Sequence, residues 1–388
     1  MNIILIHDAP LYEWKGTQKA LLELGNYLVR RGHSVTFFNN VSFRRDETEK
    51  LLSTSRVPLF SVVDFPFRKF LGIWFISKKN LQKYQPDVIY ISTFQSFFYI
   101  PFYGINTIFS TFVIGPEHEK VGTKINRATF RIKKSIFRLI TFLYRRNNTL
   151  FHTLNPTQKK WLQKTVAAKH NIYMIPPPLD CKLYKREDNN NMNLDTFNVI
   201  YLGSLTHDKG FNDFISIVHS VNKVLEDQMD KLLFIVIGSG ELEDAALNLE
   251  KMYTNVRYLG ALSENENLDV YRKSHLLVSP SYVENFHYVT AEAQLFGVPV
   301  ISSDLSGPRS IIENNITGKL VNVGQIDDFV LAILEYYRQF INDSSGYMEM
   351  MGHISQSAEK LCKEKVLPLY EEMFFSIVKK KGQFRDRT

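Results

Sequence analysis

Two carboxylates eight positions apart, Glu284 and Glu292, lie in the stretch of this sequence whose residue types best support chemistry. An apolar run at 276–278 leads into Ser-Pro-Ser, and residues 289–295 favour a helix. We therefore expect Glu284 on a strand-to-helix loop and Glu292 on the helix behind it. The free N–H groups and the positive end of such a helix favour an anion, and a diphosphate is the natural occupant. For an arbitrary pair, one dipole-stabilised charge and one solvated helix residue would be the commoner explanation.

The frame around this pair resembles the E-x7-E segment of the family 4 glycosyltransferases, retaining enzymes of GT-B fold that use nucleotide sugars. The resemblance rests on the Ser-Pro-Ser before Glu284, on Phe286, on Glu292 with the alanine after it, and on Gly-Val-Pro-Val-Ile at 297–301. It implies that Glu284 acts in catalysis by bonding a hydroxyl of the donor sugar, and that Glu292 binds the ribose hydroxyls. It also implies that the loop and the start of the helix hold the donor diphosphate, through Asn285, Phe286, His287, Tyr288 and Val289.

A second donor-binding segment follows the expected strand at 197–202, where the sequence reads Gly-Ser-Leu-Thr-His-Asp-Lys-Gly. The family has Gly-Arg-Leu and then Lys-Gly here, and both cations neutralise the diphosphate. Lys209 matches, so the resemblance gives it a role in binding the diphosphate and in stabilising its departure. Ser204 stands in place of the arginine, and either Arg309 or Lys15 is a candidate to compensate for the lost charge.

Further donor contacts are expected from backbone positions, because glycine lets the chain turn close to a nucleotide. The Gly-Ser-Gly at 238–240 follows an apolar strand and is similar to the family's Gly-x-Gly, although alone it would be only a turn. A glycine also precedes the first helix, in a strand–helix–strand unit that lacks the three-glycine dinucleotide fingerprint. The positions assigned in this way are Gly16, Gly203, Gly238 and Leu262.

One histidine is a further catalytic candidate. His118 follows an expected strand at 107–114, beside Glu117. At a strand end it is placed to contact the donor sugar or an acceptor hydroxyl. An exposed loop histidine is as often idle, so both interpretations stay open.

The elements that must position these residues follow an α/β pattern. Apolar strands alternate with helices in both halves, and 388 residues suffice for two domains. The resemblance implies the GT-B arrangement: two Rossmann-like domains face a central cleft, and a C-terminal helix crosses back to the first domain. We assign residues 1–178 to an acceptor-binding domain, 179–365 to a nucleotide-sugar-binding domain, and 366–388 to the crossover helix and a basic tail.

The formal charge of +7 favours an anionic partner. Nucleic acid is not expected, because we find no zinc spacing, RNP-like motif or recognition-helix pattern. Residues 56–83 and 124–146 combine apolar and basic side chains in the pattern of a helix on an anionic membrane surface. A core-facing helix with a solvated basic face would explain the same pattern.

The apolar runs and the cysteines of the sequence indicate whether the chain crosses a membrane and in which compartment it lies. The uncharged stretch at 88–116 is interrupted by polar residues and proline, so two buried strands joined by a short helix are expected rather than a membrane span. The first residues read as a strand and not as a signal peptide. Two cysteines, Cys181 and Cys362, are too few for a disulfide framework and fit a reducing compartment. We expect a cytoplasmic protein, peripheral on the membrane if the basic stretches bind lipid.

The sequence thus predicts a retaining hexosyltransferase that moves a sugar from a UDP- or GDP-linked donor to an acceptor hydroxyl, on a lipid-linked or membrane-proximal glycan. No metal is implied, since there is no Asp-x-Asp, and no cofactor is predicted beyond the nucleotide-sugar substrate. A nucleotide-sugar epimerase, a phosphorylase and a degenerate, non-catalytic scaffold are the alternatives. Departures from the family pattern at Lys15, Ser204 and Ser310 support the scaffold, whereas the two glutamates and Lys209 oppose it.

Overall fold

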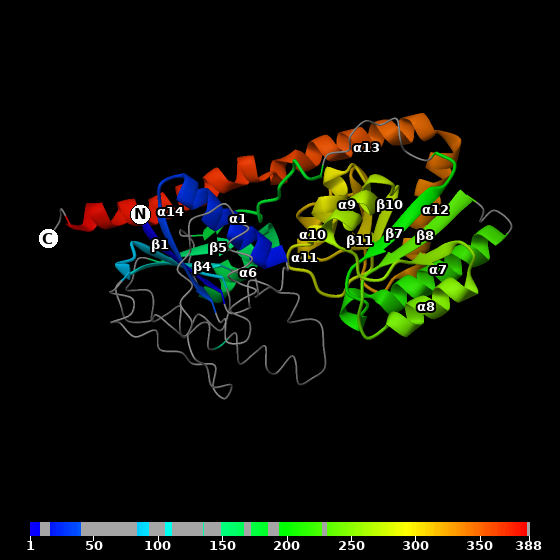
Figure 1. Ribbon diagram of the computed structural model, residues 1–388, viewed down its shortest axis with the longest axis horizontal. Helices are drawn as coiled ribbons and strands as arrows, with labels where there is room; N and C mark the ends of the chain where they lie inside the picture. The colour runs from blue at the N-terminus through cyan, green and yellow to red at the C-terminus, as the bar shows by residue number, and fades with distance from the viewer. Residues whose placement is uncertain are drawn as a thin grey trace. The chain divides into compact units, whose positions relative to one another are not determined.

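The computed structural model describes residues 1–7, 16–39, 84–92, 105–110, 135, 149–166, 172–184, 194–226 and 231–385. The chain divides into two compact units: one joins Met1–Leu179 to Lys363–Thr388, and the other is Asp180–Cys362. Each unit contains a parallel six-stranded sheet with helices (Figure 1). Two Rossmann-like α/β domains were predicted from the sequence, and the two sheets confirm this.

The sheet of the first unit has the order β2-β1-β3-β4-β5-β6. Its central strands are short apolar runs buried on both faces, as parallel sheets covered by helices require. The predicted pair of buried strands within 88–116 is present as β3 and β4. The strands are β1 (Asn2–His7), β2 (Ser34–Asn39), β3 (Val88–Ile91), β4 (Asn106–Ser110), β5 (Thr149–Thr153) and β6 (Ile172–Met174), and the helices are α1 (Gly16–Arg30) and α6 (Pro156–Val166).

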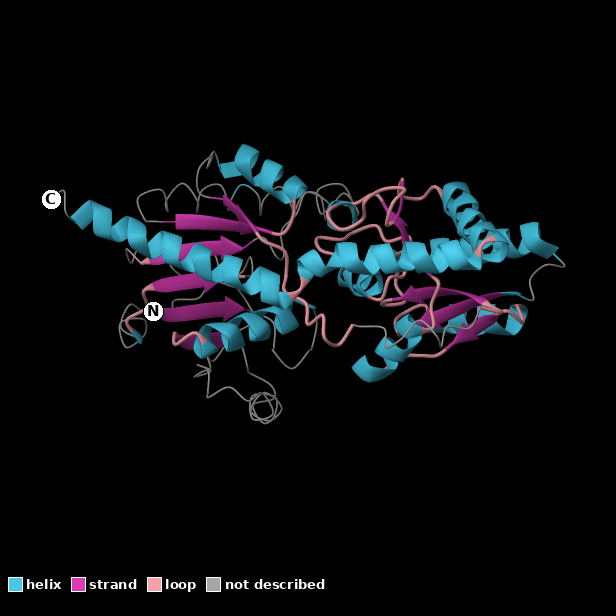
Figure 2. Ribbon diagram, turned by 90° about the horizontal axis from the view of Figure 1, so that it is seen from above, coloured by secondary structure: helices cyan, strands magenta, loops and turns pink. Residues whose placement is uncertain are grey.

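The last helix, α14 (Lys363–Arg385), packs on this first sheet, as the family resemblance implied (Figure 2). Tyr370 and Phe374 are buried in the same core as Tyr90 of β3. Glu371 accepts hydrogen bonds from Tyr27 of α1 at 3.0 Å and from Arg31 at 3.1 Å. The C-terminal helix is therefore part of the first unit, although more than 180 residues of the second unit separate it from the rest of that unit in sequence.

The sheet of the second unit has the order β12-β11-β10-β7-β8-β9. Strands β10, β11 and β12 lie on one side of β7, and β8 and β9 lie on its other side, so the order reverses between β7 and β10. Ligands of doubly wound sheets bind outside the carboxyl ends of the strands at such a point. The strands are β7 (Phe197–Leu202), β8 (Leu232–Ile237), β9 (Val256–Tyr258), β10 (Leu276–Ser279), β11 (Val300–Ser303) and β12 (Gly318–Val321).

Helices alternate with these strands in the second unit. Three of them, α7, α12 and α13, have buried apolar faces that contribute large side chains to the core of the unit. The helices are η5 (His207–Lys209), α7 (Phe211–Leu225), α8 (Glu243–Met252), α9 (Glu264–Arg272), α10 (Tyr288–Leu295), α11 (Ser306–Arg309), α12 (Ile326–Asn342), α13 (Ser344–Ala358) and η7 (Glu359–Leu361).

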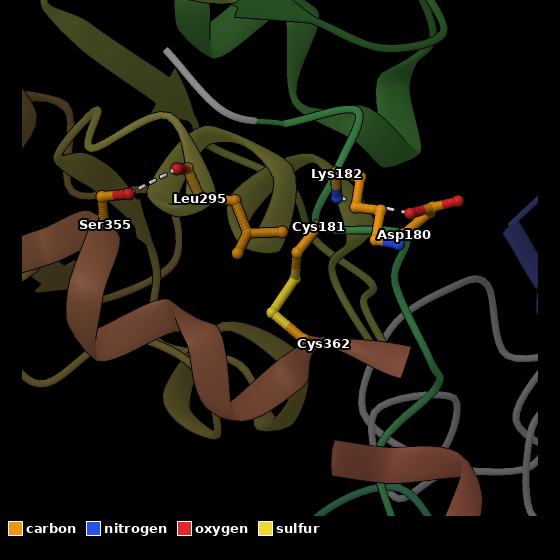
Figure 3. The surroundings of a disulfide bond; sticks show 6 residues. All are labelled: Asp180, Cys181, Lys182, Leu295, Ser355 and Cys362. Carbon is orange, nitrogen blue, oxygen red and sulfur yellow. Dashed lines mark hydrogen bonds between the residues drawn. A yellow bond between two sulfur atoms is a disulfide. The ribbon is translucent and has the colours of Figure 1, made fainter. Parts of the chain in front are cut away.

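The two cysteines form a disulfide, which corrects the expectation that they stay reduced (Figure 3). Cys181 and Cys362 are 181 positions apart in sequence, yet their Cα atoms lie 5.3 Å apart. They stand at the two ends of the second unit, which begins at Asp180 and ends at Cys362. The expectation of reduced cysteines was based on their number alone. Their positions in the sequence do not reveal that the chain enters and leaves the second unit at the same place, which brings the two sulfur atoms together.

Two predictions about membranes were made from the sequence: the chain has no membrane span, and two basic stretches contact a membrane surface. None of the helices in the described ranges combines the length and the apolar character that crossing a bilayer requires. The stretches 56–83 and 124–146, apart from Ser135, lie outside the described residues. Contact of these stretches with a membrane surface therefore stays a prediction.

Candidate active site

The candidate site lies in the second unit, where β7 and β10 run side by side and the strand order reverses. Gly203 follows the carboxyl end of β7, and Pro280 follows that of β10. The segment 203–210 and the loop 280–287 therefore leave the same edge of the sheet. These are the two segments that the sequence singled out for the donor diphosphate and sugar.

Gly210 allows the two segments to touch. It has a positive φ of 70°, and a Cβ built at this position would lie 2.0 Å from the carbonyl oxygen of Pro280. The backbone N–H of Tyr282 also donates to the carbonyl of Asp208 at 2.9 Å. Only glycine has both the backbone freedom and the absence of a side chain that this approach requires. The contact fixes the turn that carries Lys209 against the loop that carries Glu284.

Lys209 and Glu284 form an ion pair at the centre of the site. The ammonium nitrogen of Lys209 lies 2.7 Å from Oε1 of Glu284. The glutamate side chain is 9% exposed and the lysine side chain is 37% exposed, so Glu284 is buried and Lys209 is partly accessible to solvent. A charge-assisted bond of this length orients both side chains. The structure thus brings together Lys209 and Glu284, two of the three residues that the sequence analysis assigned to catalysis from separate motifs.

His287 is buried beside this pair. Its Nε2 lies 3.6 Å from Oε1 of Glu284 and 3.2 Å from the hydroxyl of Ser279, while Nδ1 bonds the hydroxyl of Thr290. Burial lowers the pKa of His287; Glu284 opposes this shift, and Lys209 adds to it. The imidazole is therefore neutral near pH 7, so its hydrogen bonds order the loop without adding a second positive charge.

Helix α10 begins directly after this histidine and carries the predicted anion-binding positions. The first N–H groups of a helix have no acceptor within the helix, and His287 provides no side-chain cap. Phe286 is buried, and its ring contacts that of Tyr288 with 5.0 Å between centroids. Asn285 is half-buried, as is Val289 in the first turn. This geometry suits an anion such as a diphosphate at the start of α10.

Glu292 lies one turn further along α10 and is held by two tyrosines that the sequence analysis did not single out. The hydroxyl of Tyr184 donates to Oε1 at 3.3 Å, and that of Tyr271 donates to Oε2 at 3.1 Å. Tyr184 follows the disulfide cysteine, and Tyr271 is on α9. They lie 108 and 21 positions from Glu292, so neither spacing gave a signal in the sequence.

The predicted glycines at the strand ends lie close together. Gly238, after β8, has a φ of 135°, and a Cβ there would lie 1.8 Å from the carbonyl oxygen of Gly203. The N–H of Gly203 in turn donates to Ile237 at 3.0 Å. The missing side chain therefore serves close packing of two strand ends, a structural role that stands beside the predicted nucleotide contact. Leu262 is half-buried between β9 and α9, where its predicted contact with the base stays a prediction.

Two further predicted donor-binding residues of the second unit, Ser204 and Arg309, make contacts within the protein. Ser204 is exposed, and its carbonyl accepts from the hydroxyl of Tyr201 at 3.0 Å. The guanidinium of Arg309 makes a two-point ion pair with Asp304, with distances of 2.6 and 2.7 Å. This pair gives Arg309 a structural role alongside its predicted compensation for Ser204.

Three candidates belong to the first unit. Gly16 opens α1 there and is half-buried. Lys15 and His118 lie outside the described residues, so their roles stay predictions. Within the described ranges, no group of three or more His, Cys, Asp or Glu side chains is arranged to hold a metal ion. The metal-independent mechanism also stays a prediction.

Fold and site together define an α/β protein of two parallel sheets, with a strand-to-helix loop suited to an anion and flanked by two glutamates and a lysine. Residues 14–183 match the family described as Glycosyltransferase Family 4, and residues 185–357 match Glycosyl transferases group 1. The chain belongs to these group 1 and family 4 glycosyltransferases, retaining enzymes of GT-B fold.

Individual relatives are distant. The 2-deoxystreptamine N-acetyl-D-glucosaminyltransferase of Niallia circulans is 28% identical over 184 residues, which are 46% of this chain and 45% of that protein. The match thus spans less than half of the curated relative. Among solved structures, sucrose-phosphate synthase from Thermosynechococcus elongatus superposes with a TM-score of 0.72 at 16% identity, covering 100% of this chain and 99% of the other.

Another solved structure, Anabaena HepE in complex with UDP and glucose, superposes with a TM-score of 0.66 at 14% identity and covers 100% of both chains. At such identities the likeness shows the GT-B fold alone. The predicted family and fold are confirmed.

Proposed function

We propose that this protein is a retaining hexosyltransferase that transfers a sugar from a nucleotide diphosphate sugar to an acceptor hydroxyl. The observation that carries the proposal is the Lys209–Glu284 pair at the carboxyl ends of β7 and β10, next to the start of α10. A cation, a helix start and a buried carboxylate are the groups that a sugar-bearing diphosphate needs. UDP is the favoured nucleotide, because the structural relative from Anabaena was solved with UDP and glucose.

In this proposal each donor group has its own partner. The ammonium of Lys209 and the N–H groups at the start of α10 bind the diphosphate, while Glu284 accepts a hydrogen bond from a hydroxyl of the hexose. Glu292 accepts from the ribose hydroxyls. The pairing of Lys209 with Glu284 aims the lysine at the loop where negative charge develops during the proposed reaction.

The proposed reaction exchanges one bond for another on the same face of the sugar. The bond between C1 and the diphosphate oxygen breaks, and its electron pair leaves with the diphosphate. The acceptor oxygen forms the new bond to C1, and its proton passes to the departing phosphate oxygen. Lys209 stabilises the charge on the leaving group, so the chemistry needs no separate general base and retains the anomeric configuration.

The acceptor side of the proposal rests on the sequence. The basic, apolar stretches at 56–83 and 124–146 support an acceptor on a lipid-linked or membrane-proximal glycan, bound at the surface of an anionic membrane.

An assay of nucleotide release tests the function and separates its rivals. UDP- and GDP-hexoses are incubated with the protein, with and without a panel of glycan and lipid-linked acceptors. A transferase releases nucleoside diphosphate in an acceptor-dependent manner. Conversion of the donor alone identifies an epimerase. Absence of both nucleotide binding and turnover identifies a non-catalytic scaffold, and either result overturns the proposal.

A further inference from the structure

Each carboxylate oxygen of Glu292 accepts a hydrogen bond from a tyrosine hydroxyl. We propose that Tyr184, on a turn fixed by the Cys181–Cys362 disulfide, is a positioning residue that orients Glu292 toward the ribose of the nucleotide, together with Tyr271. This inference rests on the proposed function and adds to it a positioning pair and a role for the disulfide.

The hydrogen bonds fix both oxygens of the carboxylate. Tyr184 donates to Oε1 at 3.3 Å and Tyr271 donates to Oε2 at 3.1 Å. A carboxylate can accept about four hydrogen bonds, so the two tyrosines define its orientation without exhausting its capacity for ribose hydroxyls. Glu292 itself is half-buried, whereas both tyrosines are buried.

Both hydroxyls remain donors at any physiological pH. Burial raises the pKa of Tyr184 far above its usual range, and the charge of Glu292 raises it further. The pKa of Tyr271 is raised well above its usual value by the same two causes, again with burial the larger. Each tyrosine therefore keeps its hydroxyl proton and can donate it to the carboxylate of Glu292.

The rings are held as firmly as the hydroxyls. Phe296, which is 1% exposed, contacts the ring of Tyr184 edge-on with 5.8 Å between centroids and stacks on the ring of Tyr271 at 5.5 Å. Since Phe296 is the C-cap residue of α10, the helix that carries Glu292 also positions the residue on which both tyrosine rings pack. The orientation of the Glu292 carboxylate and the packing of the rings of Tyr184 and Tyr271, here called the tyrosine clamp, therefore both depend on α10.

The disulfide fixes the short turn that presents Tyr184. The N–H of Tyr184 donates to the carbonyl of Cys181 at 3.3 Å, so a single hydrogen-bonded turn joins the hydroxyl donor to the sulfur bridge. Cys362 anchors the other end of the bridge to the segment after α13. Figure 3 shows the side chain of Leu295, near the end of α10, extending toward Cys181, and the carbonyl of Leu295 accepts from Ser355 of α13 at 2.7 Å.

The test measures recognition of the ribose separately from binding of the phosphates. Affinities for UDP and GDP are compared with those for their 2′,3′-dideoxy counterparts, by titration calorimetry on the full chain. The wild type is expected to prefer the ribonucleotide by about tenfold or more, as loss of hydrogen bonds to a charged group implies. Tyr184→Phe and Tyr271→Phe should each reduce this preference at least about threefold by weakening ribonucleotide binding only, since each removes one of two orienting bonds.

Tyr347→Phe is the matched control. Tyr347 is equally buried in the same unit, but its hydroxyl donates to the backbone carbonyl of His275 at 2.8 Å. It should lower the melting temperature without changing the ribose preference. A preference in Tyr184→Phe equal to that of the wild type overturns the positioning role, as does an equal loss for both classes of nucleotide.

Reduction tests the role of the disulfide. Treatment of the wild type with a phosphine reductant, or the double substitution Cys181→Ser and Cys362→Ser, should lower the ribose preference toward that of Tyr184→Phe. In the Tyr184→Phe background, reduction should change nothing further. An unchanged preference after reduction overturns the part assigned to the disulfide. A wild type that binds neither UDP nor GDP overturns the proposed function itself, which distinguishes the two failures.

Discussion

The ammonium of Lys209 lies 2.7 Å from the carboxylate of Glu284, although 75 positions separate them in sequence. The first residue follows β7 and the second follows β10, and these strands are neighbours only because the sheet reverses its order between them. The pair therefore marks the point where the fold assembles its site. It also means that removing either charge leaves a partner without its counter-ion.

Substituting the glutamates tests their roles in turnover. Glu284→Gln and Glu292→Gln keep the size of the side chain and remove its charge, so each should lower kcat/KM by about tenfold or more. Glu335→Gln is the matched control, because Glu335 pairs with Lys319 on the exposed side of the same unit. Steady-state kinetics with the best donor and acceptor provide the measurement. Full activity of both substituted proteins would refute the assigned roles.

Gly210 tests whether the close approach of the two site segments matters. Gly210→Ala places a methyl group against the carbonyl of Pro280 at a positive φ, so we expect a loss of stability above about 1 kcal/mol and a matching loss of activity. At Gly352, on α13, an added Cβ would meet no other atom within 4 Å. Gly352→Ala should be neutral or stabilise by up to about 1 kcal/mol. Urea unfolding and kinetics on both variants check this, and equal effects of the two would contradict it.

Buried His152 makes the first unit sensitive to acid. Its Nδ1 lies 2.8 Å from the hydroxyl of Ser110 and 2.9 Å from that of Tyr90, and its Nε2 lies 2.8 Å from the carbonyl of Ile175. Because the carbonyl can only accept, Nε2 carries the proton and Nδ1 accepts from the hydroxyls. Burial lowers the pKa of His152 from 6.5 to about 4, while the bond to Ile175 opposes the shift.

The sign of the pH dependence follows from this lowered pKa. Between pH 6.5 and about 4 the unfolded chain binds a proton at His152 that the folded chain does not. The free energy of unfolding should therefore fall as the pH falls through this window, by up to about 3 kcal/mol. Urea unfolding at pH 7 and pH 4.5 should show a smaller pH-dependent change in His152→Gln than in the wild type. His353→Gln, at an exposed site, should leave the change as it is.

Membrane binding is tested by charge reversal in the stretch 124–146. Each basic residue near an anionic surface contributes about 1 kcal/mol, so reversing four should release the protein from anionic liposomes. The substituted residues are Arg131, Lys133, Lys134 and Arg138. A control with the same change in net charge reverses four exposed cations of the second unit: Lys223, Lys251, Lys273 and Arg338. Equal sedimentation of both variants and the wild type would exclude this surface as the membrane contact.

Local patterns in the sequence were sufficient for the elements around the site. The apolar run before Ser-Pro-Ser predicted β10, and the helix-favouring residues at 289–295 predicted α10. Glu284 and Glu292 accordingly lie on the predicted loop and helix. Such predictions succeed because strand and helix propensities act between residues only a few positions apart. The return of the last helix to the first unit came from the resemblance to a known family.

Sequence alone thus determined the class of fold, the family and the motifs, because these depend on local residue order. Only the tertiary structure decided which residues meet: Lys209 with Glu284, Tyr184 with Glu292, and Cys181 with Cys362, over separations of 75, 108 and 181 positions. The order of the strands in the second sheet brings Lys209 to Glu284. The end of the second unit lies beside its beginning, which brings Cys362 to Cys181. Neither feature leaves a periodic signal in the chain, so the disulfide and the tyrosine clamp became visible only in three dimensions.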